Sequence, residues 1–171
     1  MRHTISVLVE NEFGVLARVA GLFAGRGYNI QSLSVAETLD PRISRITMVT
    51  TGNDAVIEQT TKQLNKLVNV IKVFDLTKEN PINRILALVK VAASSKVKPD
   101  LASVVKTLGG EIVDSDPKCS VVEIRGDEEK IGKAINLLKP HGIIELVQTG
   151  NISIQRGKGT IEEKGEKGGA G

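Results

Sequence analysis

The amino-acid sequence predicts an α+β protein made of two consecutive ferredoxin-like sandwiches, each with the element order βαββαβ. Short segments in which apolar and polar residues alternate indicate strands, and segments with apolar residues every three to four positions indicate helices. Both kinds of segment follow one another in the same order on either side of a polar stretch at residues 77–81, which ends in a proline. An internal duplication of architecture therefore explains the chain.

The first half contains four predicted strands and two predicted helices. Ile5, Val7 and Val9 alternate with polar residues in the first strand, and the dipeptide Asp40-Pro41 opens a turn between the second and third strands. Glycines after the first helix can adopt the positive φ at which a helix ends. The expected strands are 4–10, 29–37, 43–51 and 70–76, and the expected helices are 15–24 and 53–67.

The second half repeats this order at similar spacing. Gly109 and Gly110 are expected to end its first helix, and Asp127 is expected to cap its second. The expected strands are 84–91, 111–115, 119–125 and 143–148, the expected helices are 99–108 and 127–138, and a short edge strand is expected at 152–154.

The domain boundaries follow from composition. We expect domains at 1–77 and 78–157, and a disordered tail at 158–171, because glycine and charged residues dominate the tail and leave almost nothing to bury. The 51 Val, Ile and Leu residues must build the cores, since the chain has only four aromatic residues. Both faces of several strands are apolar, so we expect another copy or another subunit to cover the second sheet face.

Composition also excludes several classes of protein. With one cysteine and two histidines, the chain can form no internal disulfide and has no cluster for a structural zinc ion. No apolar run approaches the roughly 18 residues of a membrane span, and we expect no signal peptide and a cytoplasmic location. The net charge of +3 is spread along the chain without a basic block, which argues against nucleic-acid binding.

The sequence is poorly equipped for catalysis. His3 and His141 are isolated, and Cys119 has no neighbouring base, so each is expected to be structural. Asp114 and Asp116 could share acid-base work, but a strand end that enters a turn explains them more simply. We therefore expect no catalytic residue, no metal site and no cofactor in this chain.

The loop at residues 11–14 is the candidate binding site. It joins a strand to a helix, whose first-turn N–H groups have no intrahelical partners and would favour a carboxylate. Gly14 allows close approach, Asn11 offers amide groups, and Val15 and Leu16 could border an aliphatic pocket. The alternative is that Asn11 caps the helix and Gly14 only makes the turn.

Several separate blocks of the sequence resemble the regulatory small subunit of acetolactate synthase, also called acetohydroxyacid synthase. The first block reads SVLVENEFGVLARV, and the last reads TGNISIQRG. The resemblance covers essentially residues 2–157, is most specific in the first half, and would make that half an ACT domain. The matching blocks are 6–19, 21–23, 26–33, 40–41, 44–47, 63–68 and 149–157.

The resemblance implies a non-catalytic subunit that activates a catalytic large subunit and transmits feedback inhibition by valine or another branched-chain amino acid. Thiamine diphosphate, Mg²⁺ and FAD would belong to the large subunit. The effector would lie between the ACT domains of a homodimer. The positions that carry it in the family match Asn11, Gly14, Val15, Leu16, Asn29 and Ile30.

Three other functions are compatible with such a fold. One is another amino-acid-sensing module of the ACT type. A second is an RNA-recognition motif, but strand 43–51 has none of the aromatic residues that stack on bases. The third is a small phosphatase-like hydrolase, although residues 11–16 contain no arginine and only Arg18 is near. The sequence favours a binding module.

Overall fold

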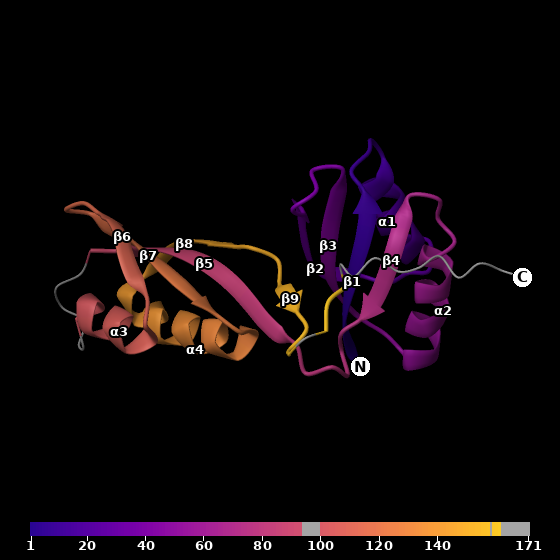
Figure 1. Ribbon diagram of the computed structural model, residues 1–171. Coiled ribbons are helices and arrows are strands. Elements are labelled where there is room, and N and C mark those ends of the chain that lie inside the picture. The colour runs from indigo at the N-terminus through magenta and orange to yellow at the C-terminus, as the bar shows by residue number, and fades with distance from the viewer. Residues whose placement is uncertain (94–99, 158, 162–171) are drawn as a thin grey trace, which may run out of the picture. The chain divides into compact units, whose positions relative to one another are not determined.

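The computed structural model describes residues 1–93, 100–157 and 159–161. It confirms the predicted fold class, because the order βαββαβ occurs twice and each half forms an antiparallel sheet with two helices (Figure 1). The chain forms two compact units. Unit 1 comprises Met1–Ile82 together with the described residues from Asn151 onward, and unit 2 comprises Asn83–Gly150.

Unit 1 has a four-stranded sheet with the strand order β2-β3-β1-β4. Helices α1 and α2 pack against one face of it (Figure 1). Its elements are β1 (Arg2–Glu10), α1 (Val15–Ala24), β2 (Ile30–Glu37), β3 (Ile43–Thr51), α2 (Asp54–Leu64), β4 (Val70–Asp75) and, from the end of the chain, β9 (Ile152–Ile154).

The core of unit 1 lies between the sheet and its helices. Alternate residues of β1 and β3 point into this layer and meet the buried stripe of α1, as the period-two pattern predicts. Phe23 is the one aromatic residue of this unit that is completely buried among the described residues. The buried cluster consists of Ile5, Val7, Val9, Val15, Val19, Phe23, Ile46, Met48, Ile57 and Leu64.

The second face of this sheet is covered in part by the chain's own C-terminal segment. The backbone N–H of Asn151 donates to Ser32 Oγ at 2.7 Å. Arg45 donates from Nη2 to the Ser153 carbonyl oxygen at 2.6 Å and from Nε to Ser6 Oγ at 3.0 Å. The sequence leads us to expect another copy or another subunit on this face, because local periodicity does not indicate that residues 151–154 return to the first sheet.

The same segment changes the division of the chain. Composition predicts one domain at 78–157, whereas the described residues from Asn151 onward group with unit 1. Of the predicted tail, residues 158 and 162–171 lie outside the described residues. Ile161 is described and only 5% exposed, which differs from the disorder predicted for it.

Unit 2 has the strand order β6-β7-β5-β8, and its helices cover one face of the sheet. Asp100 and Asp127 cap the two helices through side-chain hydrogen bonds to Ser103 N and Lys130 N, and Gly109 ends the first in the left-handed conformation. The helix predicted for 99–108 is observed from Leu101, after its cap Asp100, and residue 99 lies outside the described residues. Its elements are β5 (Ile82–Ala92), α3 (Leu101–Leu108), β6 (Glu111–Ser115), β7 (Cys119–Gly126), α4 (Glu128–Leu138), the 3₁₀ turn Lys139–His141 and β8 (Ile143–Gln148).

The attachment of the C-terminal segment can be tested at Ser32. Replacing Ser32 by Ala removes the acceptor of the Asn151 N–H and should lower the free energy of unfolding by about 1–2 kcal/mol. Ser34→Ala on the same strand is the matched control and should change it by less than about 0.5 kcal/mol. Urea unfolding of the whole chain measures both values, and equal effects would contradict the assigned role of Ser32.

Candidate functional site

The loop between β1 and α1 leaves the start of the helix open. Gly14 occupies the N-cap position at φ 79°, and no side chain caps the helix. The first turn carries no acidic residue, and the first helical hydrogen bond runs from Arg18 N to Gly14 O at 3.0 Å. Val15 N already donates to the Glu12 carbonyl oxygen at 3.4 Å, so the next amides of the first turn, those of Leu16 and Ala17, and the positive end of the helix dipole are available to an anion.

Asn11 braces this loop and does not cap the helix. Its backbone N–H donates to the Arg42 carbonyl oxygen at 2.7 Å. Its side-chain Nδ2 donates to Glu37 Oε1 at 3.1 Å and to the Pro41 carbonyl oxygen at 2.9 Å. Because the amide hydrogens are engaged, the side-chain oxygen is the atom through which Asn11 can receive a ligand ammonium group.

The two aliphatic residues at the start of α1 have different environments. Val15 is 3% exposed and packs in the core of unit 1, so only its backbone can meet a ligand. Leu16 is 39% exposed and can border an aliphatic ligand. The sequence predicts that both border a pocket, because helical spacing alone does not set the rotation of the helix about its axis.

Asn29 and Ile30 lie at the opposite end of unit 1 from Asn11. Ile30 pairs with Thr50, which pairs with His3 near the beginning of β1. Asn11 directly follows Glu10 at the other end of that strand. The seven residue steps from His3 to Glu10 separate the two groups by roughly 24 Å, so a single chain does not bring them together.

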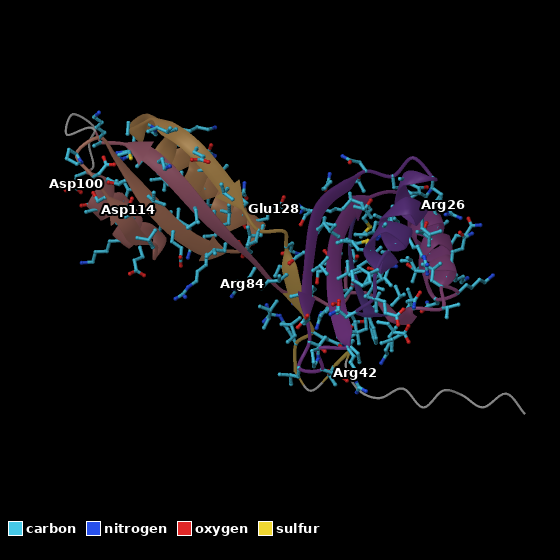
Figure 2. All side chains as sticks on the ribbon, turned by 90° about the horizontal axis from the view of Figure 1, so that it is seen from above. Arg26, Arg42, Arg84, Asp100, Asp114 and Glu128 are labelled. Atoms are coloured by element: carbon cyan, nitrogen blue, oxygen red, sulfur yellow. The ribbon has the colours of Figure 1, made fainter. Side chains whose placement is uncertain are left out.

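The turn between β2 and β3 is closed by a charge pair. Arg42 Nη2 lies 2.7 Å from Asp40 Oδ2, and the Arg42 backbone N–H donates to Asp40 Oδ1 at 3.0 Å. Arg42 is labelled in the side-chain view of Figure 2. The side-chain hydrogen bond from Arg42, followed by the backbone one, lowers the pKa of Asp40 to about 2. Asp40-Pro41 thus forms the predicted turn next to Asn11.

His3 lines a second feature that the sequence did not reveal. Its ring is 2% exposed, with Nε2 at 3.3 Å from Asp54 Oδ1 and Nδ1 at 3.6 Å from Asp75 Oδ2. These residues border a pocket of about 180 Å³ together with Glu58, Thr61 and Lys78. Within the described ranges, no group of three His, Cys, Asp or Glu residues is arranged to hold a metal ion.

Cys119, Asp116 and His141, the other groups considered for catalysis, have structural environments: the first two are hydrogen-bonded and the third is buried. Partial burial, followed by a hydrogen bond of 3.4 Å from Sγ to Asp116 Oδ2, raises the pKa of the Cys119 thiol and makes it a poorer nucleophile. Asp116 accepts backbone hydrogen bonds from Lys118 and Cys119, which lower its pKa and shape the turn before β7. His141 is buried in the 3₁₀ turn.

Among the helices of the described segments, none has the length and apolar character to cross a membrane.

Comparison with protein families gives a match in each half. Residues 5–72 match the family described as AHAS small subunit-like ACT domain. Residues 84–157 match the family described as small subunit of acetolactate synthase. The first match contains every candidate site residue, and together the two matches cover most of the chain.

Individual relatives agree with these families. The chain is 45% identical over 166 residues to the acetolactate synthase small subunit of Aquifex aeolicus, covering 96% of this chain and 86% of the relative. It is 45% identical over 157 residues to a probable acetolactate synthase small subunit of Archaeoglobus fulgidus, covering 92% and 98%. The crystal structure of the small subunit from Thermotoga maritima superposes with a TM-score of 0.84 at 37% identity, covering 93% and 99%.

The Asp40–Arg42 pair gives a pH prediction. A carboxyl whose pKa is lowered by folding stabilises the fold fully above its ordinary pKa of 3.8, and this stabilisation is lost as the pH falls through about 2. In Arg42→Ala, the NMR titration midpoint of the Asp40 carboxyl carbon should rise from about 2 toward 3.8. Arg18→Ala should leave it unchanged. A wild-type midpoint already at 3.8 would contradict the pairing.

Proposed function

The chain belongs to the family of acetolactate synthase small subunits, and we propose that it activates the catalytic large subunit and makes it sensitive to valine or another branched-chain amino acid. The observation that carries the proposal is the match of both halves to that family, together with the open helix start in the half that matches its ACT domain. Thiamine diphosphate, Mg²⁺ and FAD are proposed to bind the large subunit, in the cytoplasm, and not this chain.

The effector site is proposed to use the loop that follows β1. The amides of the first turn of α1 would receive the effector carboxylate, and the side-chain oxygen of Asn11 would receive its ammonium group. Leu16 would contact the aliphatic side chain, while Val15 holds the helix start in place from within the core. Gly14 leaves the space in front of the amides empty, since a Cβ built there meets no atom within 4 Å.

The second half of the site is proposed to come from another copy of the chain. In unit 1, β2 is an edge strand with Leu33 and Val35 exposed. Antiparallel pairing of two β2 strands across a two-fold axis would bring the Asn29 end of one copy to the Asn11 end of the other. A homodimer would thereby join two groups that one chain keeps roughly 24 Å apart.

The function is tested by adding the purified chain to its large subunit. Acetolactate formation from pyruvate should rise severalfold on addition and fall when valine is added, while the chain alone should form none. Bovine serum albumin at equal concentration controls for nonspecific stabilisation of the large subunit. Measurable product from the chain alone, or no change in the activity of the large subunit, would reject the proposed function.

The effector site is tested at Gly14. Asp and Asn at this position carry the same strain at positive φ, about 1 kcal/mol, but only Asp places a charge against the effector carboxylate. Gly14→Asp should weaken valine binding at least tenfold, which is about 1.4 kcal/mol, and Gly14→Asn should weaken it less. Calorimetry on folded variants measures both, and wild-type affinity in Gly14→Asp would place the effector elsewhere.

The sharing of the site between copies can be tested with the same variant. Gly14→Asp and Asn29→Ala should each abolish tight valine binding as homodimers. After unfolding and refolding together, mixed dimers would contain one wholly wild-type site, so about a quarter of all sites should regain wild-type affinity. No recovery in a mixture whose mass confirms dimers would show that each chain builds its own site.

A further inference from the structure

Three large apolar side chains are almost completely exposed at one end of unit 1. Phe13 is 104% exposed, Leu39 99% and Val68 93%. They come from the β1–α1 loop, the β2–β3 turn and the α2–β4 loop. These loops lie at the same end because Glu10 pairs with Ile43 and Val9 pairs with Val70 (Figure 1, upper end of unit 1). We call Phe13, Leu39 and Val68 the three-loop platform.

Two asparagines join the three loops to one another. Asn11 ties the β1–α1 loop to the β2–β3 turn through the hydrogen bonds described above. Asn69 ties it to the α2–β4 loop, because Nδ2 donates to Glu10 Oε2 at 2.7 Å and to Glu12 Oε2 at 3.1 Å. Asn69 Oδ1 accepts from Arg18 Nη1 at 2.9 Å. Both side chains therefore fix the spacing of the platform.

Short-range hydrogen bonds also fix the backbone at two of the three tips, in the β2–β3 turn and the α2–β4 loop. In the β2–β3 turn, Thr38 Oγ1 donates to the Asp40 carbonyl oxygen at 3.1 Å and Thr38 N donates to the Ile43 carbonyl oxygen at 2.9 Å, so Leu39 stands at the apex. Val68 follows Leu67, whose carbonyl oxygen accepts from Val70 N at 3.0 Å. A loop backbone held in this way loses little conformational entropy on binding, which lowers the cost of forming an interface.

The surroundings of the platform carry a net negative charge, because the three carboxylates of Glu10, Glu12 and Glu37 outnumber the guanidinium of Arg18. Glu10, Glu12 and Glu37 all accept hydrogen bonds from asparagine amides, which are neutral and do not cancel their charge. Asp40 and Arg42 neutralise each other. A complementary surface would therefore combine an apolar recess with a basic rim.

We propose that the three-loop platform docks into such a recess on the catalytic large subunit. This inference rests on the proposed function, in which the large subunit is the partner of this chain. A second copy is assigned to a different surface, the β2 edge, where main-chain groups provide the pairing. The platform differs from this edge because it consists of side chains at the tips of loops. Such side chains can enter a pocket on a partner, but they cannot add a strand to a sheet.

The test measures binding of the whole chain to immobilised large subunit. Phe13→Ala should weaken binding by about 10- to 100-fold, and Leu39→Ala and Val68→Ala by smaller factors. Asn69→Ala keeps the three apolar side chains and adds no charge but removes the hydrogen bonds to Glu10 and Glu12, so it should weaken binding about threefold to tenfold by releasing the α2–β4 loop. Faster amide exchange at residues 11–14 in that variant, with an unchanged melting temperature, would identify Asn69 as a positioning residue.

The matched control is Ile144→Ala, which removes a side chain that is 60% exposed on β8 of unit 2. If Phe13→Ala and Ile144→Ala weakened binding to the large subunit equally, or if neither weakened it, the assignment to the platform would be overturned. A lower mass of Phe13→Ala in light scattering would also overturn it, since the platform would then serve the homodimer. Wild-type chain that binds valine but not the large subunit would reject the proposed function itself.

Discussion

The register between β1 and β3 is the constraint on which the rest of unit 1 depends. Nine consecutive pairs, from Arg2 with Thr51 to Glu10 with Ile43, leave no freedom to slide without turning the buried side chains of both strands to the other face. This register sets Asn11 beside the β2–β3 turn and holds Asn29 at the far end. Loop bracing, the split site and the position of the apolar tips are all consequences of it.

Much of the fold could be predicted, because patterns of neighbouring residues determine most of its helices and strands. The alternation of Ile5, Val7 and Val9, the caps Asp100 and Asp127, and the helix-ending Gly109 depend on neighbours in sequence. The long-range contacts were not predictable in this way. Nothing near Asn151 in sequence indicates that its N–H donates to Ser32, 119 positions earlier.

In the candidate site, too, local features could be predicted from the sequence and long-range contacts could not. The start of the helix at Val15, directly after Gly14, was predicted correctly, because the apolar spacing that indicates a helix is local in sequence. The hydrogen bonds by which Asn11 braces the loop were not predicted, since its partners Glu37 and Pro41 lie 26 and 30 residues away. His3 was expected to be structural, and it is buried. Its two aspartate neighbours come from α2 and β4, which only the folded sheet brings together.

The return of the C-terminal segment to unit 1 has a consequence for synthesis on the ribosome. The whole of unit 2 emerges before Asn151, which takes roughly 4–14 s for about 70 residues at about 5–20 residues per second. During that time the nascent sheet of unit 1 has one uncovered face. On that face the polar residues Ser6 and Thr47 lie between the apolar residues Leu8 and Val49. The apolar patch is therefore smaller, and the incomplete chain has a lower tendency to aggregate.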